Sequence, residues 1–201
     1  MMKYNMDYMK EIVKENLDAI RYEHTMGVMY TAAAMAMRYD VDLQKALVAG
    51  LLHDCAKCIS TNEKISLCEE HGIIISESER KNPSLLHAKL GAFFAEEKYG
   101  VKENDILEAI TYHTTGRPKM TLLDKIVFIA DYIEPNRAQA PHLDQIRKLA
   151  FEDIDACLYM ILEDTLAYLQ TKSEVIDPMT EQTYLYYKKE WKEQCSWNNQ
   201  S

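Results

Sequence analysis

Six residues in this sequence combine a side chain that binds cations with a position on or beside an apolar helical face. They are four histidines and two aspartates, namely His24, His53, Asp54, His87, His113 and Asp131. A buried carboxylate without a partner costs several kcal/mol or more, so Asp54 and Asp131 each require positive charge nearby. A metal ion shared among these groups would meet that need. The set therefore predicts a metal centre.

Each of these residues also has an interpretation that involves no metal. A histidine on an apolar face is more often a core residue than a ligand, and Lys57 lies three positions after Asp54, where it could form an ion pair. The metal is favoured because such interpretations would have to hold repeatedly within one chain. Nitrogen and oxygen ligands without thiolate suit iron, manganese, zinc or another borderline cation and argue against calcium.

The elements that must position these residues are predicted to be helices. The chain has 6 glycines and 5 prolines among 201 residues, too few for a turn-rich β architecture. Helix-start signals recur at Asp7, Asp42, Thr61, Asn82 and Thr121. We expect an all-α fold, a single helical bundle of about nine or ten helices over residues 1–194 with a frayed polar tail at 195–201.

Charge and composition exclude several classes of partner. With 23 basic and 32 acidic residues the formal net charge is −9, which lacks the positive field that non-specific nucleic-acid binding requires. No segment reaches the roughly 18 apolar residues of a membrane span. The charged N-terminus and five irregularly spaced cysteines indicate a cytoplasmic protein with reduced thiols. An aromatic stretch at 184–191 either packs on the domain or supports a homodimer.

The order His24, His53-Asp54, Asp131 resembles the HD-domain phosphohydrolase superfamily. The strings at 21–25, 49–57, 85–89, 112–118 and 128–137 are more similar to its YqeK-type branch. That branch comprises symmetrical bis(5′-nucleosyl)-tetraphosphatases, which cleave diadenosine tetraphosphate into two ADP. The resemblance extends over roughly residues 8–190, and it implies the HD helical fold and this activity.

The resemblance also implies the metal ligands. His24, His53, Asp54 and Asp131 would hold a principal ion, iron or alternatively manganese. His87 and His113 match the additional histidines of HD enzymes that bind two ions bridged by Asp54. With one ion, both histidines would instead face the phosphates directly.

Asp54 and Lys57 would be the catalytic residues in a hydrolysis by activated water, which attacks a phosphorus beside the central bridging oxygen. Lys57 would hold a phosphate oxygen or steady the leaving group, and its alternative is the ion pair with Asp54. A dinucleoside polyphosphate or an ADP-like nucleotide is the expected ligand. The residues expected to contact it are His24, His87, His113, Thr114, Arg117, Asp131, Arg137, Ile176 and Asp177.

Some of these substrate contacts have structural alternatives. The loop from Thr114 to Arg117 is suited to phosphate, but it could equally be an ordinary turn between helices. Asp177 stands before a proline where the family has histidine. Two other functions are compatible with the sequence: an HD phosphohydrolase acting on nucleoside mono- or triphosphates, and a metal-containing nucleotide sensor with little turnover.

Overall fold

The computed structural model describes residues 4–172 and 175–198, and all regular structure within these ranges is helical. The predicted all-α class is therefore confirmed. The elements in chain order are α1 (Met6–Asn16), α2 (Ala19–Arg38), α3 (Leu43–Leu52), α4 (Thr61–Glu70), α5 (Glu77–Lys81), the 3-10 turn η1 (Pro83–Leu85), α6 (Leu86–Glu97), α7 (Asn104–Tyr112), α8 (Leu122–Ile133), α9 (Leu143–Glu152), α10 (Ile154–Gln170) and α11 (Pro178–Asn198). None of the helices in the described ranges has the length and apolarity needed to cross a membrane.

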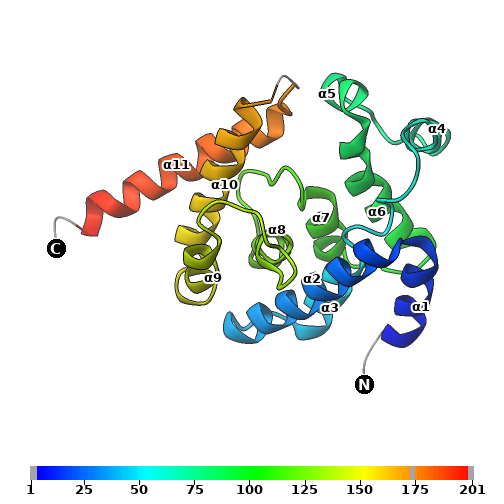
Figure 1. Cartoon of the computed structure of the whole chain (residues 1–201), viewed down its shortest axis with the longest axis horizontal. Coiled ribbons are helices and arrows are strands. Elements are labelled where there is room, and N and C mark those ends of the chain that lie inside the picture. The colour runs from blue at the N-terminus through cyan, green and yellow to red at the C-terminus, as the bar shows by residue number, and fades with distance from the viewer. Residues whose placement is uncertain (1–3, 173–174, 199–201) are drawn as a thin grey trace.

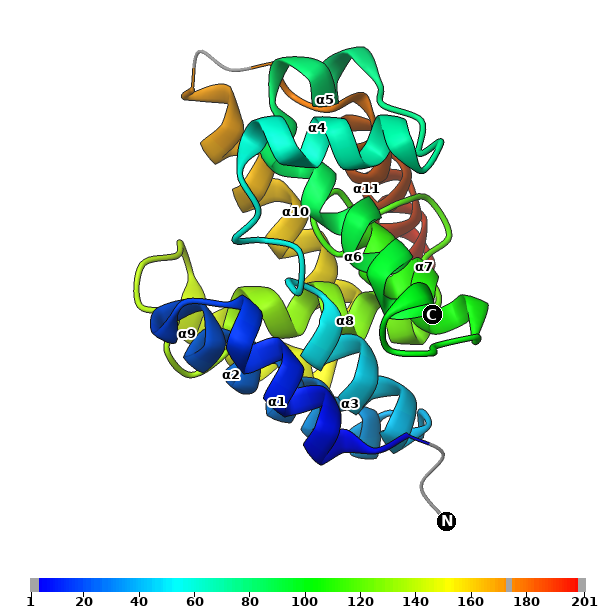
Figure 2. The same cartoon turned by 90° about the vertical axis from the view of Figure 1, so that its right-hand side faces the viewer.

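Helix α8 lies at the centre of the bundle. Figure 1 shows α9, α10 and α11 on one side of it and α4, α5 and α6 on the other, and the turned view of Figure 2 shows α1, α2 and α3 together beneath it. Helix α2 packs against both α3 and α8, while α7 packs against both α6 and α8. Four helices carry or precede predicted metal ligands, α2, α3, α7 and α8, and within this group α3 and α8 each pack against the other three.

The crossing of α2 and α3 is close because Gly50 has no side chain. A Cβ at that position would lie 2.9 Å from the Cα of Met29 on α2, closer than real Cβ atoms approach a backbone. Met29 and Leu51, both fully buried, fill the space beside the crossing. This contact fixes the end of α3, and with it the residues that follow, against α2.

Local capping signals set where the helices of the site begin. Asp42 accepts a hydrogen bond from the amide of Lys45, and Thr121 forms a reciprocal capping box with Asp124, both as predicted. Asp18, which the sequence signals did not single out, caps α2 through the amide of Arg21.

Four predicted helix boundaries differ from the structure. Helix α1 is capped by Asn5 and not by Asp7, and α4 by Ser60 and not by Thr61, because the side chain that reaches the free amides stands one or two residues earlier. The apolar run from Leu43 to Ala56 favours a helix of that length, but α3 ends at Leu52. Pro83 begins a 3-10 turn before α6, and no side chain caps that turn.

The C-terminal aromatic stretch packs on the domain. The ring of Tyr159 on α10 stacks on Tyr184 and Trp191 of α11, at centroid distances of 6.2 and 5.7 Å. The hydroxyl of Tyr187 accepts a hydrogen bond from the amide of Met120. The predicted tail lies partly outside the described residues, and its described part, 195–198, continues α11.

Candidate metal centre

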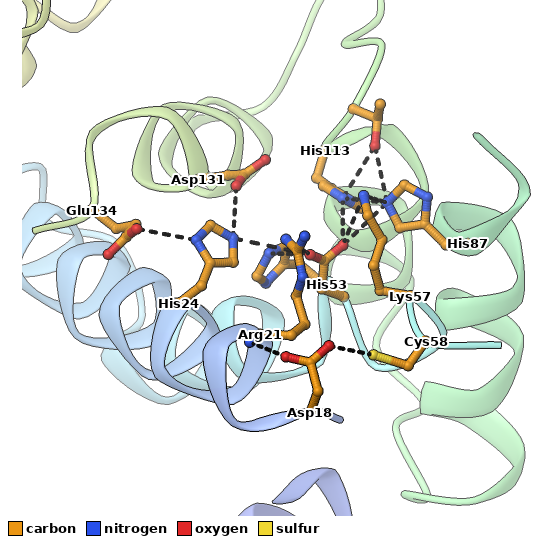
Figure 3. A network of polar contacts seen from close by, with 12 residues as sticks. Asp18, Arg21, His24, His53, Lys57, Cys58, His87, His113, Asp131 and Glu134 are labelled. Carbon is orange, nitrogen blue, oxygen red and sulfur yellow. Dashed lines mark hydrogen bonds and ion pairs between the residues drawn. The ribbon is translucent and has the colours of Figure 1, made fainter. Parts of the chain in front are cut away.

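The six predicted ligands converge on one site, which Figure 3 shows from close by. His24 projects from α2 and Asp131 from α8, whereas His87 lies on α6. His53 and Asp54 follow the last residue of α3, and His113 follows the last residue of α7. All are buried except Asp131, which is half-buried. Five segments far apart in the sequence thus deliver these side chains to a common point.

The Asp54 carboxylate is the middle of the cluster. The Nε2 atoms of four histidines lie within 4 Å of it, at 3.1 Å for His87, 3.6 Å for His53, 3.6 Å for His113 and 3.9 Å for His24. Asp131 Oδ1 lies 3.0 Å from His24 Nε2. Ligand atoms of His24, His53 and Asp131 lie within 4.8 Å of one another, as do those of His53, Asp54 and His113.

Every histidine of the cluster has its Nδ1 engaged away from the centre. For His53, His87 and His113 the partner is the main-chain carbonyl three residues earlier, at 2.8, 2.5 and 2.7 Å. For His24 it is the carboxylate of Glu134, at 3.1 Å. A histidine that donates from Nδ1 presents the lone pair of Nε2, which is the arrangement of a metal ligand held by its surroundings.

The protonation states also suit metal binding. Burial lowers the pKa of His53 and of His87 to about 4, so both rings are neutral at pH 7. Burial would raise the pKa of Asp54, but the surrounding histidines and Lys57 hold it well below its usual range. Two neutral imidazoles beside an ionised carboxylate are donors that borderline divalent cations bind.

The lone pairs at the centre fit a cation because they face one another. His87 Nε2 and His113 Nε2 are 3.1 Å apart, and the Nδ1 contacts leave a lone pair on each. Among the described residues, His53 Nε2 is buried without a hydrogen-bond partner, and the buried His24 Nε2 and Asp54 Oδ1 contact other charged or chargeable groups of the site. Burying acceptor atoms such as these costs free energy unless a donor or a cation shares their lone pairs. A metal ion would do so, and the residues present therefore fit one.

Cationic side chains border the cluster. Lys57 Nζ lies 3.1 Å from His87 Nε2 and 3.5 Å from Asp54 Oδ1, so the predicted ion pair with Asp54 is present. Arg21 Nη1 contacts the other Asp54 oxygen at 2.9 Å. The Thr114 hydroxyl lies 3.1 Å from His113 Nε2. Positive groups and a hydroxyl are therefore available where a phosphate chain would meet the metal.

Arg137 reaches the cluster from a turn that α9 holds in place. Its guanidinium contacts both the carboxylate and the main-chain carbonyl of Asp131, at 3.0 and 2.9 Å. The guanidinium of Arg147 donates to the carbonyls of Ile133 at 3.0 Å, of Glu134 at 2.9 Å and of Arg137 itself at 3.0 Å. Because the Arg137 side chain remains 39% exposed, it can also meet a ligand.

Two cavities border Thr114. The Arg137 cavity, about 460 Å³, lies between α8 and α10 and is also lined by His113 and Asp131. The Asp177 cavity, about 410 Å³, lies between α5, α6, α7 and the start of α11. Asp177 accepts a hydrogen bond from the Ser78 hydroxyl at 2.6 Å. Ile176 beside it is half-buried.

Arg117 is a predicted site residue whose side chain two carboxylates hold away from the cluster. Its guanidinium lies 2.7 Å from Glu108 and 2.7 Å from the buried Asp124, and it contacts none of the six ligands. Contact with phosphate would require it to leave both carboxylates, so that role stays a prediction.

Glu134 and Arg147 are the functional neighbours that sequence reasoning missed. A glutamate before a proline at a helix end resembles a surface turn residue. The one signal in the sequence was its position three residues after Asp131, inside the string 128–137.

Comparisons with known proteins agree with this geometry. The HD domain family model matches residues 21–136. A protein of Bacillus subtilis named "Bis(5'-nucleosyl)-tetraphosphatase, symmetrical" is 42% identical over 172 residues, 86% of this chain and 91% of that protein. One of the same name from Halalkalibacterium halodurans is 42% identical over 176 residues, 87% and 92% of the two chains.

A solved structure has the same fold. The crystal structure of a "predicted HD superfamily hydrolase involved in NAD metabolism" from Clostridium acetobutylicum matches with a TM-score of 0.89 and 37% identity. The match covers 93% of this chain and 98% of that one.

Proposed function

This chain belongs to the HD-domain family and, within it, to the symmetrical bis(5′-nucleosyl)-tetraphosphatases, and on that premise we propose how its residues divide the reaction. The reaction is the hydrolysis of diadenosine tetraphosphate to two ADP. The observation that carries it is the convergence of four histidines and Asp131 around Asp54.

The cofactor is a divalent metal ion, and we assign iron, with manganese as the alternative. His24, His53, Asp54 and Asp131 would hold the principal ion. His87 and His113 would share Asp54 with a second one or face the phosphates. When bound, the metal activates water at neutral pH and stabilises negative charge on phosphate oxygens.

Lys57 acts on the phosphates in this proposal. Its Nζ lies against both His87 and Asp54, so it can donate to a phosphate oxygen without leaving the cluster. A fixed cation at this point opposes the negative charge that develops on the departing ADP. Asp54, which lies among the histidine lone pairs that would hold the metal, and Lys57 are therefore the two catalytic residues.

Thr114 and Arg137 contact the rest of the phosphate chain. Cleavage in the middle of the tetraphosphate requires the central phosphates to lie at the cluster, with one nucleoside extending to either side. The Arg137 cavity and the Asp177 cavity both reach Thr114, and each has a volume of the order that a nucleoside requires, some hundreds of Å³. Ile176 and Asp177 would contact the nucleoside in the second cavity.

Product analysis tests the proposal. Purified protein is incubated with diadenosine tetraphosphate and Mn²⁺ or Fe²⁺, and nucleotides are separated by chromatography. We expect ADP as the sole product and none in the presence of a chelator. AMP with ATP would mean asymmetric attack and contradict the placement of the phosphate chain. Release of nucleoside or tripolyphosphate from nucleoside mono- or triphosphates, with diadenosine tetraphosphate left intact, would instead support the alternative HD phosphohydrolase function.

The homodimer and the cytoplasmic location stay predictions from the sequence. Light scattering on the purified protein checks the first, with a mass near 23.3 kDa expected for a monomer.

A further inference from the structure

We propose that Glu134 is a positioning residue for the metal ligand His24, and that Gly27 is required because it leaves the space that the Glu134 carboxylate occupies. The inference rests on the proposed function in one respect, since it takes His24 as a ligand. It assigns roles to two residues outside the ligand set and outside the substrate contacts.

Glu134 is a buried carboxylate directed at His24. Its side chain is 2% exposed, and Oε1 lies 3.1 Å from His24 Nδ1. The other oxygen accepts the amide hydrogen of Asn136 at 2.7 Å. Among the described residues, His24 is the one charged or chargeable side chain in an ion-pair contact with it. A carboxylate this buried needs such a partner, so the contact orients both groups.

This contact differs from those of the other three histidines. His53, His87 and His113 each donate to a main-chain carbonyl of their own helical turn. His24 alone donates to a charged group, and that group is brought by a different helix, α8. A carboxylate partner fixes the ring and makes the metal-binding nitrogen a stronger donor than a carbonyl partner does.

Gly27 is the second, independent observation. It lies inside α2, one turn after His24, where glycine is less favourable than alanine by roughly 1 kcal/mol. A Cβ at Gly27 would lie 2.4 Å from Glu134 Oε2 and 3.3 Å from its Cδ. The carboxylate therefore occupies the place of a side chain at residue 27, which gives the glycine a packing reason.

The test measures metal affinity and not turnover. Metal-free protein is titrated with Mn²⁺ against a fluorescent chelator, and apo-protein melting is followed by circular dichroism. We expect Glu134→Ala and Gly27→Ala to weaken Mn²⁺ binding about 10–100-fold. Glu134→Gln, which keeps an acceptor oxygen but loses the charge, should lie between these variants and the wild type.

Gly91→Ala is the matched control. Gly91 also lies in a helix near the cluster, but an added Cβ would meet only ordinary contacts, the nearest being Ile110 at 3.4 Å. This substitution should leave Mn²⁺ affinity unchanged. In the double variant Gly27→Ala/Glu134→Ala the two losses should not add, because both remove the same contact.

Wild-type Mn²⁺ affinity in either Glu134→Ala or Gly27→Ala would overturn the proposal, and a lowered melting temperature alone would make Glu134 a purely structural residue. If Glu134→Ala does not fold, Glu134→Gln and Gly27→Ala decide the question. The outcome is separate from that of the proposed function. If the wild-type protein does not hydrolyse diadenosine tetraphosphate but the Glu134 and Gly27 variants lose Mn²⁺ affinity as expected, the proposed function is contradicted and this inference is supported.

Discussion

The two sides of the cluster around Asp54 are chemically unlike. On one side His24 lies between two carboxylates, Asp131 at 3.0 Å and Glu134 at 3.1 Å. On the other, His87 lies between His113 and Lys57, each at 3.1 Å. We call these the carboxylate side and the lysine side. The first gathers negative charge around its histidine, and the second gathers two imidazole rings and a cation.

The pKa values follow the same division. Burial lowers the pKa of His24, but hydrogen bonds with Asp131 and Glu134 outweigh it and the net shift is upward. Burial lowers the pKa of His87 to about 4, with Lys57 acting in the same direction. The difference teaches that the carboxylate side is built to retain a cation, whereas the lysine side is built to meet an anion.

The largest effect is expected at Asp54, which both sides share. Asp54→Ala removes the carboxylate that joins them, so bound metal should be lost and kcat/KM should fall by at least about 10³-fold, since metal assistance is worth several kcal/mol. Metal content and steady-state kinetics measure this, and the helical circular dichroism should remain. Substantial residual activity would show that the site has been misassigned.

Replacing one histidine on each side distinguishes the two directly. His24→Ala should reduce the bound metal to less than half of the wild-type content. His87→Ala should retain an ion while kcat falls about 100-fold, because the Nε2 lone pair that would bind a second ion or take up a proton beside the phosphates is lost. Elemental analysis of desalted protein and kcat at saturating substrate give both readouts. The opposite pattern would mean that the two sides have been assigned in reverse.

Substitution of two arginines tests how far the lysine side, which meets the anionic phosphates, extends. Arg137→Ala should raise KM about tenfold with metal content unchanged, since a charged hydrogen bond contributes about 1.5–3 kcal/mol. Arg117→Ala is its counterpart and should lower the melting temperature, because the buried Asp124 loses its cationic partner. A rise in KM for the Arg117 variant would instead support the predicted contact between Arg117 and phosphate.

The smallest effect is a difference in pH dependence for the metal-free protein. His87 has a lowered pKa, so between its ordinary value of 6.5 and about 4 the unfolded chain binds more protons, and stability is lost as the pH falls through this range. His24 has a raised pKa, so its contribution is complete below 6.5 and is lost as the pH rises through the folded-state pKa.

Thermal melts in chelator from pH 4.5 to 8.5, a window set by ordinary histidine titration at about 6.5, would show this. His87→Gln should flatten the acid side of the profile and His24→Gln the alkaline side, each by a few degrees at most. Identical profiles for the two variants would remove the electrostatic distinction between the sides.

Signals carried by neighbouring residues made much of the fold predictable. Asp42 and Thr121 cap their helices through amides three positions away, so the nearby sequence contains both partners. The six ligands were predictable for a different reason: buried carboxylates need cations, and their order along the chain resembles a known family.

Contacts between distant segments were not predictable in this way. Glu134 acquires its role from His24, 110 positions away. That distance leaves no spacing pattern in the sequence. The early end of α3 at Leu52 has the same origin, because the residues after it turn away to present His53 and Asp54 to helices that lie elsewhere in the chain.

The placement of His53, His113 and Asp131 has a further consequence for the order of binding. The first two follow the last residues of α3 and α7, and Asp131 lies in the last turn of α8. Three helices thus direct their C-terminal ends, each with a dipole charge of about −0.5, toward one point. That field attracts a cation and repels a tetraphosphate. In the metal-free protein this field opposes the attraction that Lys57 and Arg137 exert on the phosphates, so we expect nucleotide to bind more weakly before the metal than after it.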